Sequence, residues 1–323
     1  MKPAFIDKLL TTSKNAKVAI MGHKSADFDC ICSCIAMHMI LKQFNISSDI
    51  FVEEDLSPVF KRFLGDIPYK SATTIKYDTC ICVDCSTMSL IPDNLMPIFA
   101  NAKETFVIDH HISNTKFAKY NYVKLLSSAC EVIYTLFGPK IKLTYEIARA
   151  LYLGIYTDTG GFKYSNATSH TFLVLSKLLK IDIKSDEIVH EYVDLVTKSA
   201  FELTKCAFNS VQFYQNDQIA VSTITKSDFD KVGLKKDSAK FMQSYLQNIE
   251  GVKIAITVSE QTSNDYHISL RTACNDVNVS SIAARFGGGG HIRASGLTLK
   301  GDYKKALNAL LLECKNTLKG KKL

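Results

Sequence analysis

The chain has 323 residues, of which 46% are hydrophobic and 22% charged, so it is long enough for two domains and too apolar to be disordered. Its first residues lack the apolar stretch of a signal peptide, and no run reaches the roughly 18 apolar residues of a membrane span, so we expect a cytoplasmic protein. The net charge of +7 suits anionic ligands but is equally typical of a lysine-rich, soluble surface.

Strands and helices alternate through the first half. Lys17–Gly22 predicts a buried strand and Cys30–Leu41 a helix. The same patterns predict strands at 49–52, 79–83 and 105–108, and helices at 57–64, 86–99, 127–137, 144–156 and 169–179. Alternation of this kind predicts a doubly wound parallel sheet.

The second half begins with a change of pattern. Residues 181–208 are charged and helix-compatible without a strand, which predicts a helical linker between a domain at 1–180 and a smaller α/β domain at 209–323. In that second domain we expect strands at 218–223, 252–259 and 266–271, and helices at 237–249, 279–286 and 303–318.

Ten cysteines are present, and six of them form two close groups. Both groups lie in apolar runs, and neither is followed by a second pair at zinc-finger spacing. We therefore interpret them as buried, reduced thiols that pack as small hydrophobic side chains. The groups are Cys30, Cys32 and Cys34, and Cys80, Cys82 and Cys85.

Carboxylates and histidines follow the ends of several predicted elements. Since the carboxyl ends of parallel strands meet at one edge of a sheet, these side chains can converge there. Singly, each Asp is more typical of a helix cap or turn, but together they indicate a metal cluster. Mixed carboxylate and imidazole donors favour Mn²⁺, with Mg²⁺, Co²⁺, Fe²⁺ or Zn²⁺ also compatible. The residues are His23, Asp27, Asp29, Asp84, Asp109, His110, His111 and Asp158.

A second group of interest lies near the carboxyl terminus. Four glycines, Gly287–Gly290, precede His291, and Arg271, Arg285 and Arg293 fall in the same stretch. Glycines let backbone N–H groups approach an anion, and the guanidinium fork matches phosphate. A flexible loop is the simpler interpretation of such a run.

The order and spacing of these motifs resemble the DHH/DHHA1 phosphoesterase superfamily over nearly the whole chain, and most of all its stand-alone nanoRNase/pAp-phosphatase group. The relatives of that group include phosphodiesterases for cyclic di-AMP and linear pApA. The motifs are His23-x-x-x-Asp27-x-Asp29, Asp84 in Val-Asp-Cys-Ser, Asp109-His110-His111, Thr157-Asp158-Thr159-Gly160-Gly161-Phe162, and Gly287-Gly-Gly-Gly-His291-x-x-Ala-Ser-Gly296.

The resemblance implies a DHH domain that holds two Mn²⁺ ions, a DHHA1 domain that binds substrate, and an active site in the cleft between them. On the matching positions, His23 and Asp27 bind one ion, Asp29, His110 and Asp158 bind the other, and Asp84 bridges the two. It also implies that His111 lies near the scissile phosphate and that Asp109 orients a histidine. Substrate binding is expected at Arg271, Gly288, Gly289, Gly290 and His291.

The function implied is a manganese-dependent phosphodiesterase that cleaves short oligonucleotides and dinucleotides (nanoRNA, pApA, cyclic di-AMP) to mononucleotides and also removes the 3′-phosphate of pAp. A homodimer is expected. Phe162 and Tyr164 either stack on a base or pack between the two domains. The alternatives are an inorganic pyrophosphatase, a RecJ-like single-strand exonuclease and, in a different class, a non-catalytic nucleotide sensor.

Overall fold

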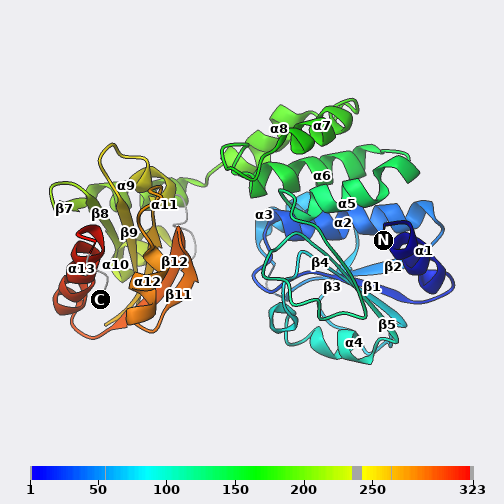
Figure 1. Cartoon of the computed structure of the whole chain (residues 1–323), viewed down its shortest axis with the longest axis horizontal. Helices are drawn as coiled ribbons and strands as arrows, with labels where there is room; N and C mark the ends of the chain where they lie inside the picture. The colour runs from blue at the N-terminus through cyan, green and yellow to red at the C-terminus, as the bar shows by residue number, and fades with distance from the viewer. Residues whose placement is uncertain (1, 55, 235–241, 263, 321–323) are drawn as a thin grey trace. The chain divides into compact units, whose positions relative to one another are not determined.

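The computed structural model describes residues 2–54, 56–234, 242–262 and 264–320 (Figure 1). The chain divides into two compact units, Met1–Leu195 and Val196–Leu323. The expected linker, residues 181–208, lies across this division. Its first part contains helix α8 (Ser185–Val189) and the π-helical turn η3 (His190–Asp194), and its second part contains most of helix α9 (Lys198–Asn209).

The first unit contains a six-stranded sheet in the order β3-β2-β1-β4-β5-β6, and all its strand pairs are parallel. The order reverses between β1 and β4, so the carboxyl ends of these two strands and of β5 open onto one crevice, where open α/β sheets bind ligands. The strands are β1 (Val18–Met21), β2 (Ser48–Phe51), β3 (Tyr69–Lys70), β4 (Thr79–Val83), β5 (Glu104–Asp109) and β6 (Tyr120–Val123).

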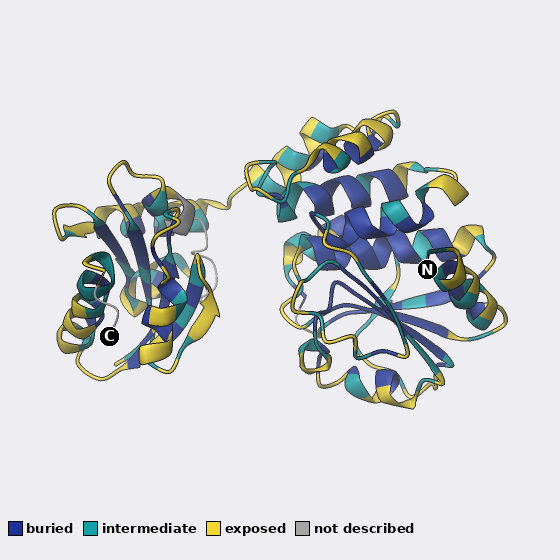
Figure 2. Ribbon diagram, in the orientation of Figure 1, coloured by how far each residue is buried: buried dark blue, intermediate teal, exposed yellow. Residues whose placement is uncertain are grey.

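Helices cover both faces of this sheet. On one side α2 (Phe28–Gln43) lies against the strands, with α5 (Ala129–Phe137) and α6 (Tyr145–Asp158) packed beside it (Figure 1). Helix α2 is buried nearly all round, as expected of a helix that is apolar on every face (Figure 2). The remaining helices are α1 (Lys2–Ser13), α3 (Pro58–Leu64), the 3₁₀ turns η1 (Met88–Leu90) and η2 (Gly138–Lys140), α4 (Met96–Asn101) and α7 (Ser169–Leu178).

One predicted helix of this unit is wrong. Residues 86–99 do not form a continuous helix, because η1 and α4 are separated around Pro92. Proline has no N–H to donate and restricts the residue before it, so a helix cannot run through this position undisturbed. The short strands β3 and β6 were not predicted.

The second unit is built on another six-stranded sheet, in the order β11-β12-β10-β9-β8-β7, in which only β8 and β9 run parallel among the pairs that the structure describes. Its apolar core lies on both faces of the sheet. The strands are β7 (Gln212–Tyr214), β8 (Ile219–Ile224), β9 (Ile254–Thr262), β10 (Asp265–Arg271), β11 (Gly289–His291) and β12 (Ala294–Lys300), and the helices are α10 (Lys226–Val232), α11 (Met242–Gln247), α12 (Val279–Arg285) and α13 (Tyr303–Leu318), besides α9.

The predicted fold class, a doubly wound parallel domain followed by a smaller α/β domain, is confirmed. The three strands expected in the second unit are present as β8, β9 and β10, whereas β7, β11 and β12 were missed. The helix expected at 237–249 falls partly outside the described residues, which contain its later portion as α11. Within the described ranges, no helix combines the length and apolar character that crossing a bilayer requires.

Candidate metal centre

Side chains from three strand ends meet at the carboxyl edge of the first sheet. Asp84, which follows β4, lies between His23, which comes after β1, and His110, which follows β5. The Nε2 atom of His23 is 3.4 Å from Asp84 Oδ2, and the Nε2 atom of His110 is 3.4 Å from Asp84 Oδ1. One carboxylate therefore presents a separate oxygen to each imidazole, the arrangement expected of a ligand that bridges two ions.

Both imidazoles are oriented by backbone carbonyls. The Nδ1 atom of His23 lies 2.8 Å from the carbonyl oxygen of Lys24, and that of His110 lies 3.3 Å from the carbonyl oxygen of Leu126. A neutral ring that donates from Nδ1 leaves the Nε2 lone pair directed at the carboxylates. Metal-binding histidines are commonly oriented in this way.

Asp29 and Asp158 complete the group on the His110 side. Asp158 is the last residue of α6, and its Oδ2 lies 3.6 Å from His110 Nε2. Potential donor atoms of Asp29, His110 and Asp158 all lie within 4.8 Å of one another. The buried Asp29 carboxylate is held by the first turn of α5, since it accepts hydrogen bonds from the N–H groups of Ala129 at 2.6 Å and Cys130 at 3.0 Å.

A glycine allows this close packing. Gly154 lies on α6 where that helix passes α2 and α5, and an added Cβ would stand 2.3 Å from the Sγ of Cys130 and 2.9 Å from Oδ1 of Asp29. Any side chain at this position would displace both Asp29 and the residue that anchors it. Gly154 was not singled out from the sequence.

Asp27 lies at the rim of the group. Its Oδ1 caps α2 by accepting a hydrogen bond from the N–H of Cys30 at 3.0 Å, and the same oxygen is 3.9 Å from His23 Nε2. The side chain is 61% exposed, so it keeps a free approach to solvent. The structure thus gives Asp27 a capping role, and its role as a ligand stays a prediction.

The electrostatics of the cluster favour a cation. Burial raises the pKa of Asp29, and the charges of Asp84 and Asp158 raise it further; burial and Asp84 likewise raise that of Asp158 to about 6. Burial acts against the charge of Asp84, but the attraction of the nearby His110 and His23 imidazoles outweighs it and lowers the pKa of Asp84 to about 2. For both imidazoles burial is likewise outweighed by Asp84, and the pKa rises to about 10 for His110 and about 12 for His23.

The residues present therefore fit divalent cations. Three buried or half-buried carboxylates crowd together, and Oδ1 of Asp84 is inaccessible to solvent without a hydrogen-bond partner among the described residues. A buried carboxylate oxygen without a partner is costly, and an ion between Asp84 and the imidazoles would remove that cost. Carboxylate and imidazole donors are compatible with Mn²⁺, Co²⁺, Fe²⁺ or Zn²⁺.

The carboxylate of Asp109 positions the imidazole of His111. Asp109 is fully buried, and its Oδ1 lies 2.8 Å from Nδ1 of His111, a contact that raises the pKa of that imidazole. Its Oδ2 accepts a hydrogen bond of 2.6 Å from the side-chain amide of Asn114, which also donates to the carbonyl oxygen of Cys85 at 3.1 Å. Asn114 was not predicted, because nothing in its local sequence distinguishes it from a turn residue.

A buried glutamate connects the helices around Asp29 and Asp158, and it too was missed. Glu131 is fully buried on α5, with Oε1 2.5 Å from Nδ1 of His170 and Oε2 accepting from the N–H of Ser127 at 2.9 Å. Asn166 links the same region to Asp158, because its side-chain amide donates to the carbonyl oxygens of Ser127 and Asp158. These contacts fix the segments that carry the cluster.

The aromatic residues after Asp158 have different environments. Phe162 packs against Tyr156 and Phe172, with ring centroids 5.2 and 5.6 Å away. Tyr164 is 57% exposed. Phe162 thus packs within the first unit, and the two predicted interpretations, stacking on a base and packing between the domains, stay predictions for Tyr164.

In the second unit two of the predicted substrate-binding residues lie on the strands that flank β12, one on each side. Arg271 at the end of β10 and His291 at the end of β11 both pair with Ala294 of β12. Side chains of directly paired residues project from the same face of a sheet, so Arg271 and His291 flank the small Ala294 on one face. On this face, the methyl group of Ala294 therefore separates the guanidinium of Arg271 from the imidazole of His291.

Steric crowding also explains why glycine occupies two positions of the run Gly287–Gly290. An added Cβ at Gly288 would lie 2.2 Å from the carbonyl oxygen of Gly296, and one at Gly290 would lie 2.6 Å from that of Ala294. Gly289 has nothing within 4 Å. The N–H of Gly288 already donates to the carbonyl oxygen of Ala283. The close pairing of β11 and β12 therefore accounts for two of these glycines without a ligand.

Comparison with known proteins assigns a family to both units. The model of the DHH family, N-terminal domain, matches residues 17–155, and the model of the DHHA1 domain matches residues 216–319. Together the two matches take in each strand of the predicted metal-binding sheet and the second unit from β8 to α13.

Individual relatives agree with this assignment. The chain is 27% identical to the bifunctional oligoribonuclease and PAP phosphatase NrnA of Mycoplasma genitalium over 97% of this chain and 98% of the relative. It is 30% identical to the protein of the same name from Mycoplasma pneumoniae over 67% of this chain and 65% of the relative. A solved structure of an exopolyphosphatase-related protein from Bacteroides fragilis has a TM-score of 0.85, with 23% identity over 98% of this chain and 97% of its own, which supports the fold. The chain therefore belongs to the DHH/DHHA1 phosphoesterase superfamily and is a hydrolase of phosphoester bonds.

Proposed function

We propose that the protein is a metal-dependent phosphodiesterase that cleaves short oligonucleotides and dinucleotides to mononucleotides and also acts on the 3′-phosphate of pAp. The observation that carries this proposal is the position of Asp84 between the oriented imidazoles of His23 and His110, with Asp29 and Asp158 beside them. The names of the full-length relatives, oligoribonuclease and PAP phosphatase, support the substrate class.

In the proposed site, one ion is held by His23, Asp27 and Asp84, and the other by Asp29, Asp84, His110 and Asp158. Two divalent ions, with Mn²⁺ as the favoured metal, supply Lewis-acid activation of water and of the phosphoryl oxygens when bound.

The protein's own groups then position the substrate. The hydrogen bond that Nδ1 of His111 donates to Asp109 fixes the ring and raises the pKa of the imidazole, which favours its protonated form. The Nε2–H of that form can donate to a phosphoryl oxygen or to the leaving oxygen. Because His111 is 40% exposed, a substrate can reach it.

For the second unit we propose that Arg271 and His291 hold a phosphate of the substrate away from the scissile bond. Their place on either side of Ala294, together with the bidentate geometry of a guanidinium, supports this role. Arg271→Ala should raise KM for dinucleotides while leaving metal affinity unchanged. The matched control is Arg293→Ala, a neighbouring arginine whose side chain contacts Asn275, and an equal change in KM for both variants would contradict the role.

The experiment that tests the function is a hydrolysis panel with Mn²⁺ over pAp, RNA of two to five nucleotides, pApA, cyclic di-AMP and pyrophosphate. We expect linear dinucleotides to be cleaved fastest, cyclic di-AMP next, and pyrophosphate not at all. Asp84→Asn should lose turnover on every substrate while keeping its fold by circular dichroism. Exclusive hydrolysis of pyrophosphate, or nucleotide binding without turnover, would favour the pyrophosphatase or sensor alternatives, and processive degradation of long single strands would favour the RecJ-like one.

The expected homodimer, the cytoplasmic location and the active site between the two units stay predictions. Sedimentation of the purified chain would settle the first of these.

A further inference from the structure

The thiol of Cys30 lies beside the candidate metal centre. Its neighbours in the sequence predict only that it packs as a small hydrophobic side chain. Cys30 lies in the first turn of α2 and is 1% exposed. Potential donor atoms of His23, Cys30 and Asp84 all lie within 4.8 Å of one another. Cys30 therefore lies within the same 4.8 Å limit as the predicted ligands of the opposite side, Asp29, His110 and Asp158.

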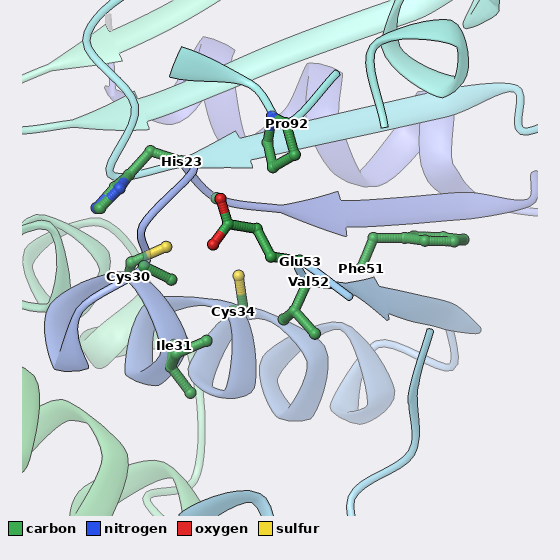
Figure 3. Close-up of a pocket in the computed structure, with 10 residues that line it drawn as sticks. His23, Cys30, Ile31, Cys34, Phe51, Val52, Glu53 and Pro92 are labelled. Carbon is green, nitrogen blue, oxygen red and sulfur yellow. The ribbon is translucent and has the colours of Figure 1, made fainter. Parts of the chain in front are cut away.

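The surrounding structure makes room for this sulfur. Gly22 precedes His23, and an added Cβ there would stand 2.0 Å from the Sγ of Cys30. The thiol therefore occupies the space that a side chain at position 22 would fill. Figure 3 shows Cys30 and Cys34 on α2 with their thiols directed into the pocket that His23 and Glu53 also line.

The carboxylate of Asp84 also faces this side of the centre. Asp84 is 3% exposed in its side chain, and its Oδ2 lies 3.4 Å from Nε2 of His23. Its other oxygen, Oδ1, which has no hydrogen-bond partner among the described residues, lies on the opposite side, 3.4 Å from Nε2 of His110. A cation held between His23 and Oδ2 of Asp84 would have the sulfur of Cys30 as its next neighbour.

The two sides of the cluster differ in chemical hardness. The side formed by Asp29, His110 and Asp158 offers carboxylate oxygens and one imidazole nitrogen. The side formed by His23, Cys30 and Asp84 offers one sulfur, one nitrogen and one oxygen. Thiolates select Zn²⁺ and other thiophilic ions, whereas carboxylates suit Mg²⁺ and Mn²⁺.

We propose that Cys30 is a sulfur ligand at the His23 side of the centre, which makes this position selective for thiophilic divalent ions such as Zn²⁺, Co²⁺ or Cd²⁺, while the Asp29 side takes a hard ion. Binding releases the thiol proton to solvent. The inference rests on the divalent-ion site of the proposed function and specifies its metal preference. It adds a ligand role to the buried, free thiol that the sequence predicted.

The test uses the full-length protein without substrate. One equivalent of Co²⁺ should produce a sulfur-to-cobalt charge-transfer band in the near ultraviolet, and Cys30→Ala should lose that band. Cd²⁺ affinity, measured by calorimetry, should fall about tenfold or more in Cys30→Ala, since even residues that contact metal ligands only indirectly contribute about 10–100-fold. The matched control is Cys32→Ala, a buried cysteine of the same helix that packs in the apolar core. It should keep both the band and the affinity.

A further measurement, on the wild-type protein, makes the outcome independent of variant folding. Zn K-edge absorption of the zinc-loaded wild-type protein should show one sulfur neighbour at about 2.3 Å. The inference is overturned if wild-type protein binds Co²⁺ without a charge-transfer band, if Cys30→Ala keeps the band, or if Cys34→Ala loses it while Cys30→Ala does not. Failure of the proposed function is distinguishable, because a protein that shows the band but hydrolyses no nucleotide would refute only the function.

Discussion

Gly154→Ala should disable the metal centre at a modest cost in stability. The new methyl would stand 2.3 Å from the Sγ of Cys130, whereas unstrained contacts of this kind need about 3.5 Å or more, so Cys130 must move by about 1 Å. The N–H of Cys130 holds Oδ1 of Asp29, which itself lies 2.9 Å from the methyl, so the carboxylate moves with its anchor.

The magnitude follows from two opposing terms. Overpacking in a filled core costs about 1–3 kcal/mol, and replacing glycine by alanine within a helix returns up to about 1 kcal/mol. The net loss should be about 0–2 kcal/mol in the free energy of unfolding, whereas a shift of about 1 Å in a group that positions the reaction can reduce turnover about 100-fold.

The assay compares denaturant unfolding, Mn²⁺ affinity and hydrolysis of pApA in Gly154→Ala, Cys130→Ala and the double variant. Removing the sulfur in the double variant relieves the closest contact, so it should recover part of the metal affinity and turnover lost in Gly154→Ala. Wild-type metal affinity and turnover in Gly154→Ala would refute the reasoning, and so would a double variant that recovers neither.

Three other changes give separate tests. Asn114→Ala should cost about 2 kcal/mol in unfolding free energy, because it leaves one oxygen of the buried Asp109 without its donor, and should lower kcat more than it raises KM; a stability equal to wild type would contradict the contact. Gly290→Ala should destabilise the second unit by about 1–3 kcal/mol, since its φ is +140° and the methyl meets backbone atoms, whereas Gly289→Ala should be neutral; equal losses in urea unfolding would argue against this steric account. Addition of Mn²⁺ at about 100 times its Kd should raise the unfolding free energy by about 2.7 kcal/mol, and chelation or Asp84→Asn should abolish the increase in calorimetry.

The sequence predicted the elements whose local pattern agrees with their tertiary environment. The strand at 79–83 was expected with the bounds it has, because it is an unbroken apolar run that is buried on both faces. β6 was missed because Tyr120–Val123 mixes polar and aromatic residues at the edge of the sheet, and β12 was missed because Ala294–Lys300 contains small and polar residues. β6 is an edge strand, whereas β12 lies between β10 and β11, and strands of either kind that lack an apolar pattern are defined only by pairing with a neighbour.

The residues of the site likewise divide into those with a local sequence signal and those whose role depends on tertiary packing. His23, Asp84 and His110 were identifiable because each comes soon after a strand, and topology alone brings strand ends together. Gly154 and Glu131 were not identifiable, because their roles depend on how α5 and α6 pack. Cys30 was correctly predicted as a buried, free thiol from its apolar neighbours in sequence, whereas its position next to His23 appears only in the folded chain.

The backbone of Asp84 restricts how this site can change during evolution. Its φ is +53°, a left-handed conformation that Asp, Asn and Gly tolerate and that costs most other residues about 1–2 kcal/mol. A lineage that abandoned catalysis while keeping the fold would thus pass most easily through Asn or Gly at this position. A descendant that carries a β-branched residue there would need a rearranged strand end. Asn or Gly at position 84 would therefore indicate a site that has lost catalysis with its backbone unchanged, and a β-branched residue would indicate a site whose backbone has changed.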